Sequence, residues 1–236
     1  MSELIKQLSQ GLIVSCQALE DEPLYGADIM AAMALAAQQG GARAIRANSP
    51  EDIAMIKKKC SLPVIGLYKK SYPDCPVYIT PTMAEVDAVV RSGADIVALD
   101  ATMLERPDGV TAEQLIAAVR DRFPGMPILA DVSTYDEGVH AMELGVELVS
   151  TTLSGYTPYS RQQDGPDLEL VEKLANLKRT PVIAEGKIWT PQECVRCFGA
   201  GAYAVVVGTA ITRPREITKR FLDQIDTERI RILRSG

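Results

Sequence analysis

Short hydrophobic runs, each about as long as one buried β-strand, recur along the whole chain. Their starts lie about 27 residues apart on average, which is the length of a strand, a helix and the two loops that join them. The runs are rich in Val, Ile, Leu and Ala, as strands covered on both faces are. They occupy residues 12–17, 42–47, 63–69, 95–101, 127–133, 147–153, 181–187 and 202–208.

Amphipathic helices are predicted between these runs. Apolar side chains recur there at spacings of three and four residues, so that each stretch presents one apolar stripe to a sheet. The predicted stripes are Ile29, Met33, Ala36 and Ala37; Ile53, Ile56 and Cys60; Met83, Val86, Val89 and Val90; Leu168, Val171, Leu174 and Ala175; and Ile217, Phe221 and Ile225.

Four of these helices are expected to begin with a capping box. In this motif a threonine and a Glu or Gln three residues later satisfy each other's backbone N–H groups. The four pairs are Thr82 with Glu85, Thr111 with Gln114, Thr134 with Glu137, and Thr190 with Glu193.

Eight strands that alternate with eight helices predict a (β/α)8 TIM barrel of the ribulose-phosphate-binding kind, as a single domain over residues 1–236. The alternative is a doubly wound open sheet. That fold usually carries a G-x-G-x-x-G turn after its first strand. The residues after the first run, CQALEDEPLYG (16–26), lack this turn.

Composition narrows the classes of partner. The 236 residues carry a net charge of −6, which argues against nucleic acid or an anionic membrane as a main partner. No apolar run approaches the roughly 20 residues of a membrane helix, and the first ten residues lack the apolar core of a secretory signal. Five cysteines without a dense framework predict reduced thiols and a cytoplasmic location.

Polar residues gather at the predicted strand ends, where barrels of this kind carry their chemistry. Asp100 could be structural, as could Asp131, whereas Glu185 and Lys69 together favour catalysis, because a charge in an apolar strand is costly unless it is paired. Strand alternation points Lys69 inward and Lys70 to solvent. The residues at these ends are Gln17, Arg46, Lys69, Asp100, Thr102, Asp131, Thr151, Thr152, Ser154, Glu185, Gly186, Lys187, Gly208 and Thr209.

The lack of a histidine at any strand end restricts the acid–base chemistry. The one histidine, His140, lies in a predicted helix, so that His-ligated zinc sites and Ser-His-Asp triads are excluded and no metal or other cofactor is expected. Cys194 and Cys197 form a C-x-x-C pair inside another predicted helix with no second pair nearby, which we interpret as structural. Proton transfer would then use Lys, Glu, Asp or Tyr, and a lysine can serve where burial or a nearby cation lowers its pKa.

Glycines after the last two strands indicate phosphate binding. Barrels often bind phosphate with the loops after strands 7 and 8 and a short extra helix. Gly186, Gly208 and Thr209 lie there, and Arg213 follows. Glycine lets backbone N–H groups approach the phosphate oxygens, although the same glycines could merely turn the chain.

Two loops are long enough to be lids over a ligand. They cover residues 18–26 and 155–167, after the first and the sixth strand. Both carry tyrosines beside Gly or Pro, which is consistent with closure over a bound molecule.

Nine segments, spread over nearly the whole chain, carry a family resemblance. They are GLIVSCQALEDEPL (11–24), RAIRANSPEDI (43–53), PVIGLYKKSYPD (63–74), YITPTMAEV (78–86), ADIVALDAT (94–102), LADVST (129–134), TTLSGYT (151–157), PVIAEGKIWTP (181–191) and VVVGTAITRP (205–214). Through them the chain resembles the N-acetylmannosamine-6-phosphate 2-epimerases of bacterial sialic-acid catabolism.

The resemblance implies an isomerase that reversibly epimerises C2 of an N-acetylhexosamine 6-phosphate without metal or nicotinamide. It makes Lys69 the proton-transfer group at C2, and Glu185 the group that assists ring opening or the companion proton transfer. The expected partner is a small phosphosugar, and a homodimer is one assembly the chain could form. The implied substrate-binding residues are Gln17, Arg46, Asp131, Thr152, Gly186, Gly208, Thr209 and Arg213, the last four at the phosphate.

Two other functions stay open at this point. The chain could be another phosphate-binding barrel enzyme, although the D-x-K-x-x-D signature of the decarboxylases is absent from the fourth strand, DIVALDATM (95–103). It could also be a non-catalytic sugar-phosphate-binding protein. Such a protein would not need both Lys69 and Glu185.

Overall fold

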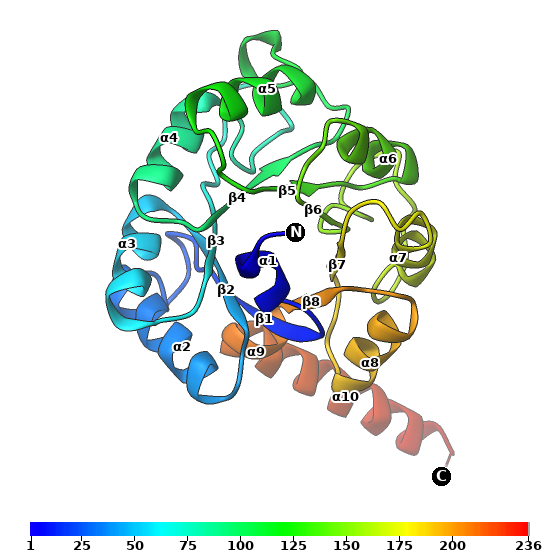
Figure 1. Cartoon of the computed structure of the whole chain (residues 1–236). Helices are drawn as coiled ribbons and strands as arrows, with labels where there is room; N and C mark the ends of the chain where they lie inside the picture. The colour runs from blue at the N-terminus through cyan, green and yellow to red at the C-terminus, as the bar shows by residue number, and fades with distance from the viewer. Residues whose placement is uncertain (236) are drawn as a thin grey trace.

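Parallel strands close into a barrel, and helices surround it (Figure 1). The computed structural model describes residues 1–235, with side chains described except at 108 and 230–235. Within that part, eight strands pair in chain order and β8 closes on β1, which confirms the predicted (β/α)8 fold with strand ends shifted by at most three residues. The strands are β1 (Gly11–Cys16), β2 (Ala44–Asn48), β3 (Val64–Leu67), β4 (Ile96–Asp100), β5 (Ile128–Asp131), β6 (Leu148–Ser150), β7 (Val182–Glu185) and β8 (Ala204–Val207).

The helices after the first seven strands cover the outside of the barrel. All four predicted capping boxes are present, at the starts of α4, α5, α6 and α8. Short helices α1 (Glu3–Gln7), η1 (Pro107–Gly109) and α9 (Thr209–Thr212) complete the order, with a long α10 (Pro214–Ser235). The covering helices are α2 (Ala27–Gln39), α3 (Pro50–Lys59), α4 (Met83–Arg91), α5 (Ala112–Arg122), α6 (Tyr135–Glu143), α7 (Leu168–Ala175) and α8 (Pro191–Gly199).

Alternation along the strands divides the core into two layers. Side chains at every second strand position point outward and pack against the helices, as Val14, Ile45 and Val97 do. The positions between them fill the barrel interior, as Ile13 and Ile65 do. The interior is therefore a packed core rather than a pore, and a ligand must bind at an end of the barrel.

Helix α1 closes the N-terminal end of the barrel. In Figure 1 it lies across the centre of the ring of strands. Ile5 and Leu8 are buried in the interior cluster, and the Tyr203 hydroxyl donates to the Ile5 carbonyl at 3.1 Å. The C-terminal end of the strands is thus the end where a cavity can form.

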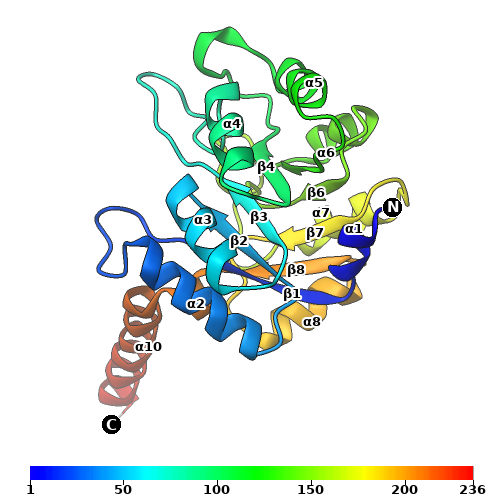
Figure 2. The same ribbon diagram turned by 60° about the vertical axis from the view of Figure 1, so that its left-hand side comes forward.

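The apolar face of α2 differs from the predicted one. Ile29 is 37% exposed, whereas Met30, Ala31 and Ala34 are buried. The residues of α2 are apolar nearly all round, so that periodicity alone does not select a face. Figure 2 shows α2 beside α3 on one flank of the barrel.

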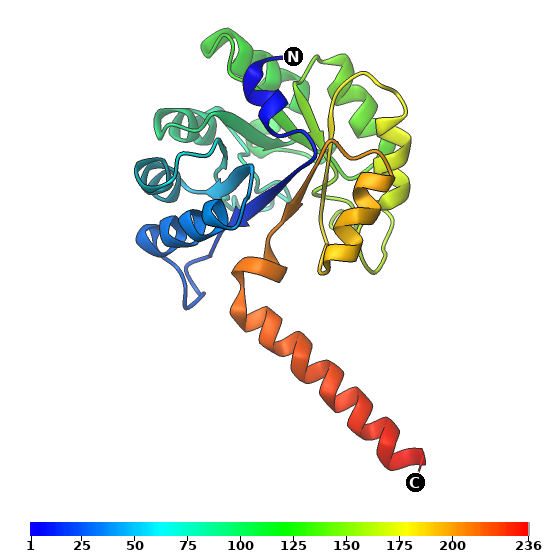
Figure 3. The same ribbon diagram turned by 60° about the horizontal axis from the view of Figure 1, so that its bottom comes forward.

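The last helix does not lie on the sheet. Figure 3 shows α10 extending away from the barrel. On it Phe221 is 67% exposed and Ile225 is 50% exposed, which contradicts the prediction that their stripe covers the barrel. The stripe itself is real, but the barrel of the same chain does not bury it. No helix in the described part of the chain is both long and apolar enough to cross a membrane.

Candidate active site

The inward rows of the strands end in polar residues at the C-terminal mouth. Each row is apolar deep in the barrel, as with Ile65 and Leu67 on β3, and its next inward position is polar or glycine. The fold therefore brings together residues from all eight strands that are far apart in the sequence. These end positions are Gln17, Arg46, Lys69, Asp100, Asp131, Thr152, Glu185 and Gly208.

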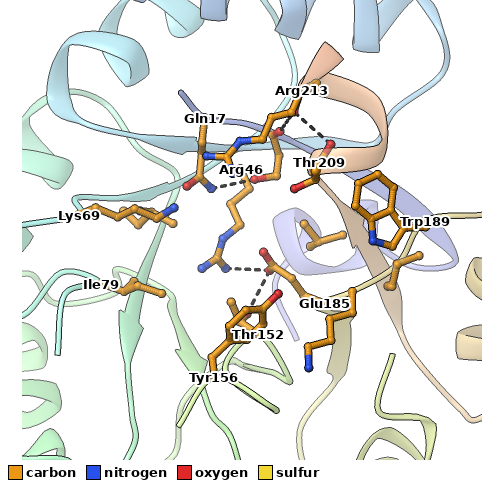
Figure 4. A pocket seen from close by; sticks show the side chains of 18 of the residues that line it. Gln17, Arg46, Lys69, Ile79, Thr152, Tyr156, Glu185, Trp189, Thr209 and Arg213 are labelled. Atoms are coloured by element: carbon orange, nitrogen blue, oxygen red, sulfur yellow. Dashed lines mark hydrogen bonds and ion pairs between the residues drawn. The ribbon is translucent and has the colours of Figure 1, made fainter. Parts of the chain in front are cut away.

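A cavity of about 340 Å³ lies over these rows. Every catalytic or substrate-binding residue that the family resemblance implies lines it except Asp131, which is fully buried and paired with Arg46. Figure 4 shows Lys69 and Trp189 on opposite walls, with Arg46 and Glu185 between them.

Arg46 forms the centre of a buried ion-pair network. Its two terminal nitrogens bind the two carboxylate oxygens of Asp131 at 3.1 and 2.5 Å, and its Nη1 also lies 3.2 Å from Glu185 Oε2. The Thr152 hydroxyl lies 2.6 Å from Asp131 Oδ1 and 3.1 Å from Glu185 Oε2. Burial lowers the pKa of Arg46, but the two carboxylates outweigh it and the net shift is upward. The guanidinium therefore stays charged and fixed in orientation.

Lys69 enters the cavity from the segment just beyond β3. Burial, together with the positive charges of Arg213 and Arg46, lowers the pKa of Lys69 to about 8, although Glu185 and Glu22 oppose the shift. A minor fraction of this amine is then neutral near physiological pH, and a neutral amine can accept a proton. Its inward direction confirms the prediction from strand alternation. Lys70 is 49% exposed and pairs with Glu85 at 3.3 Å.

Glu185 has the opposite tendency. Burial raises its pKa, and the neighbouring Asp131 carboxylate raises it further against the opposing effects of Arg46 and Lys69. A carboxyl group with a raised pKa can hold a proton and donate it. The site thus places Lys69, a weakened base just beyond β3, and Glu185, a weakened acid at the end of β7, on opposite sides of the barrel.

The rim above β7 and β8 offers donors for an anion. Gly186 has φ of 107°, a conformation that favours glycine, and an added Cβ at Gly208 would come within 3.2 Å of Ser15 Cβ. Gly208 precedes α9 and makes no side-chain cap, so no capping side chain accepts from the first N–H groups of that helix, and both Gly208 and Thr209 line the cavity. Arg213 also lines this rim, where its Nη2 pairs with Glu22 at 2.5 Å.

Comparison with known proteins places this geometry in a family. A sequence profile described as "Putative N-acetylmannosamine-6-phosphate epimerase" matches residues 30–227. This chain belongs to that family. A family relative from Caldanaerobacter subterraneus subsp. tengcongensis, named "Putative N-acetylmannosamine-6-phosphate 2-epimerase", is 57% identical over 227 residues, which cover 96% of each chain. A Clostridium perfringens relative with the same name is 52% identical over 212 residues, 90% of this chain and 95% of its own.

One solved structure agrees with the assignment to the epimerase family, and a second shares only the fold. One, described as the N-acetylmannosamine-6-phosphate 2-epimerase from Clostridium perfringens, superposes with a TM-score of 0.90 at 49% identity, over 94% of this chain and 96% of that chain. A thiamine phosphate pyrophosphorylase from Pyrococcus furiosus reaches a TM-score of 0.62 at 18% identity, over 92% of this chain and 93% of that one. This second likeness shows the fold alone.

Several cavity residues of this family member were not singled out from the sequence. Ser15 lies two positions before Gln17 in the same inward row, and its hydroxyl accepts from Gln17 Nε2 at 2.8 Å, so alternation could have found it. Tyr78 and Ile79 come from the loop after β3, and Trp189 from the loop after β7, where no periodic signal exists.

The two predicted lid loops contribute differently to the cavity. Tyr156 lines it from the loop after β6, beside Lys187, whose ammonium lies 5.3 Å from the Tyr156 ring centroid. The loop after β1 contributes Glu22 through its pair with Arg213, while its Tyr25 is 52% exposed and does not line the cavity. Closure of either loop stays a prediction.

The remaining polar candidates have structural partners. Asp100 accepts from the Thr102 backbone and hydroxyl at 2.8 and 2.6 Å, lies 3.8 Å from Arg106 Nη2 and does not line the cavity. His140 lies in α6, and the Cys194 and Cys197 pair lies in α8. Across the residues whose side chains are described, no group of three or more His, Cys, Asp or Glu side chains is arranged to hold a metal ion.

Proposed function

We propose that this protein is an isomerase that interconverts N-acetylmannosamine 6-phosphate and N-acetylglucosamine 6-phosphate by epimerisation at C2. Its family and the names of its relatives support this activity. The observation that carries the proposal is the placement of Lys69, an amine whose pKa is lowered to about 8, across one cavity from the protonatable Glu185.

The reaction begins with opening of the pyranose ring, because the proton on C2 becomes acidic only when C1 is a carbonyl. Lys69 then takes the C2 proton, and the electron pair of the broken C–H bond moves onto the C1 oxygen. Return of a proton to the opposite face of C2 gives the epimer. Glu185 assists ring opening or the companion proton transfer.

The buried network holds the charged groups for this chemistry. Arg46 lines the cavity and bears a fixed positive charge, which stabilises negative charge developing on the substrate oxygen. Gln17 and Thr152 line the same cavity and contact the sugar. Asp131 does not reach the cavity surface, so we assign it the orientation of Arg46 and Thr152 rather than a direct contact.

The 6-phosphate binds at the rim above β7 and β8. Backbone N–H groups at Gly186, Gly208 and Thr209 and the guanidinium of Arg213 surround this part of the cavity. Binding energy from the phosphate orients a sugar whose reacting atom lies elsewhere in the site. In the free protein Glu22 is the counter-ion of Arg213, and the phosphate would replace it.

We place the reaction in amino-sugar and sialic-acid catabolism in the cytoplasm. The five cysteines of the chain are free thiols, which fits a reducing compartment.

We also propose that the protein forms a homodimer through α10. The exposed apolar stripe of this helix needs a partner, and an apolar groove of about 330 Å³ lies on the barrel between β1, α2 and α9. Leu12, Met33 and Ala37 line this groove, which lies beside the start of α10. In such a dimer, α10 of each copy covers the apolar groove on the barrel of the other copy.

Proton NMR of N-acetylmannosamine 6-phosphate with the protein in D2O, without added metal, tests the activity. We expect signals of N-acetylglucosamine 6-phosphate to appear, with deuterium at C2 as the mark of proton transfer through an exchanging group. Saturable binding of the phosphosugar by folded protein without any conversion would contradict the proposal and favour a non-catalytic binding protein.

A further inference from the structure

Lys69 continues the inward-facing row of β3, but it lies two residues beyond the end of that strand. The strand β3 ends at Leu67, and β3 pairs with β4 only through Ile65 and Gly66. A lysine two residues past the last strand position would ordinarily sit in a mobile loop. Something other than the barrel ladder must therefore fix its backbone.

On the β2 side, the side chain of Asn48 holds this backbone. The Lys69 N–H donates to Asn48 Oδ1 at 2.8 Å, and Asn48 is only 7% exposed. Asn48 is the last residue of β2, opposite Leu67. The next residue, Ser49, donates its N–H to the Leu67 carbonyl at 3.0 Å, then turns out of the sheet with φ of 73° and caps α3, so the backbone of β2 pairs no further than Leu67. The amide side chain of Asn48 supplies an acceptor beyond the point where β2 ends.

On the β4 side, a returning segment occupies the gap between β3 and β4. Residues 78–80 run antiparallel to the Lys69 segment: Lys70 N–H donates to the Tyr78 carbonyl at 2.9 Å, and Thr80 N–H donates to the Tyr68 carbonyl at 2.9 Å. The fully buried Thr80 hydroxyl accepts from Tyr68 N–H at 3.1 Å and donates to the Ala98 carbonyl of β4 at 2.7 Å. This side of Lys69 is therefore tied to the barrel.

We propose that Asn48 is a positioning residue for Lys69, which fixes the backbone that aims the amine into the cavity beside Arg46 and Arg213. The inference rests on the proposed function, in which Lys69 exchanges the C2 proton. Proton transfer to carbon is sensitive to misplacement of the base by an ångström or less. Of the two sides that hold Lys69, only the Asn48 side depends on a single side-chain acceptor.

The placement also controls the electrostatics of the amine. The lowered pKa of Lys69 comes first from burial and then from the charges of Arg213 and Arg46. If the Lys69 backbone becomes more mobile, its ammonium can move toward water and away from Arg213 and Arg46. Both changes favour the protonated form and raise the pKa of Lys69 toward its ordinary value.

Three variants test the role of Asn48. Asn48→Ala removes the acceptor, and Asn48→Asp keeps an acceptor of the same shape but adds a negative charge near Lys69. Asn176→Ala is the matched control, since Asn176 is exposed at the end of α7. Circular dichroism and thermal melting establish which variants are folded.

For Asn48→Ala we expect kcat to fall by about 10- to 100-fold with KM changed by less than about threefold. The acid limb of the kcat/KM profile should move to higher pH. In Asn48→Asp most of kcat should return at high pH, while the limb still moves upward because the carboxylate favours the ammonium. The Asn176→Ala enzyme should match the wild type.

A second readout needs no turnover. The 13Cε signal of Lys69, in protein labelled at lysine and assigned by its absence in Lys69→Met, reports its titration directly. We expect the titration to move upward in both Asn48 variants and to stay in place in Asn176→Ala. Folded Asn48 variants with wild-type kcat and an unmoved titration would overturn the inference. If the wild-type protein lacked epimerase activity while this titration moved as expected, the proposed function would fail and the positioning would stand.

Discussion

At the scale of single residues, the cavity keeps Lys69 in an unfavourable environment. Its pKa is lowered to about 8 from an ordinary value near 10.5, because the folded protein disfavours the ammonium. Well below pH 8 the amine is protonated in both folded and unfolded chains, and the folded state is then destabilised by the full cost of the buried ammonium. Between pH 8 and pH 10.5 Lys69 loses its proton in the folded protein but keeps it in the unfolded chain. Above about pH 10.5 the amine is neutral in both states, and burial of the ammonium no longer lowers the free energy of unfolding.

Replacing Lys69 with Met should therefore abolish epimerisation and stabilise the fold at pH 7. The shift corresponds to a gain of about 1–2 kcal/mol in the free energy of unfolding, after allowance for the part of the side chain that water still reaches. Urea unfolding at pH 7 and at pH 10.5 measures the gain, which should shrink at the higher pH. Lys70→Met is the control and should keep its turnover. Retained epimerase activity in Lys69→Met would remove Lys69 from the mechanism.

Much of the residue-scale site follows from sequence periodicity. The inward rows that begin with Ile65 and Ile183 continue to Lys69 and Glu185, and alternation alone points both into the barrel. The same logic cannot show that Asp131 stops short of the cavity. That outcome depends on tertiary packing around the Arg46–Asp131 ion pair, in which Arg46 lines the cavity and Asp131 is fully buried.

At the scale of elements, the loop after β6 is attached to the loop after β7 by one lysine. Lys187 donates to the Gln163 carbonyl at 2.9 Å, and its ammonium lies 5.3 Å from the centroid of the Tyr156 ring. Lys187 adopts a left-handed φ of 56°, which is uncommon for a residue with a side chain. The two contacts hold Tyr156 against the cavity.

We expect Lys187→Met to loosen the loop after β6 without touching the proton-transfer groups. Loss of the hydrogen bond and of the cation–π contact should raise KM by about 3- to 10-fold, with kcat within about twofold. Steady-state kinetics measure the effect, and limited proteolysis within residues 155–167 should become faster. Lys58→Met, at an exposed position of α3, is the control. An unchanged KM together with unchanged proteolysis would show that Lys187 does not hold the loop.

Elements with strong local signals were predictable, whereas those that depend on distant contacts were not. Capping boxes such as Thr82 with Glu85 mark helix starts because all the interacting atoms lie within four residues. The segment 78–80, which fills the gap between β3 and β4, has no such local cause. Its place is set by the Ala98 carbonyl and by the backbone of Tyr68 and Lys70, which lie far from Ala98 in the sequence.

At the scale of the whole molecule, α10 shows that periodicity predicts a helix and its apolar face but not the surface that this face contacts. The spacing of Ile217, Phe221 and Ile225 predicts a helix with one apolar stripe, and this much is present. The spacing does not identify the surface that buries the stripe, because packing against a sheet of the same chain and packing against a second chain both require the same spacing of apolar residues. The turn at Arg213 and Pro214 directs α10 away from its own barrel (Figure 3).

If a second copy covers the stripe, a charge within it should separate the subunits. Phe221→Glu places a carboxylate at the most exposed apolar position of the stripe, and burying that charge in an apolar groove is costly. We expect light scattering to give the mass of a dimer for the wild type and of a monomer for Phe221→Glu. Thr227→Glu adds the same charge to α10 away from the stripe and should remain dimeric.

The active site offers a second measurement on the same two variants. Lys69 and Glu185 line the cavity from the same chain, so a folded monomer should keep its proton-transfer groups. Yet Arg220 of α10 lies 4.7 Å from the Trp189 ring centroid, which couples the start of this helix to the cavity wall. Monomeric Phe221→Glu should therefore retain C2 exchange with a raised KM. A wild-type protein that is monomeric at micromolar concentration would contradict the homodimer and leave the stripe of α10 without a partner.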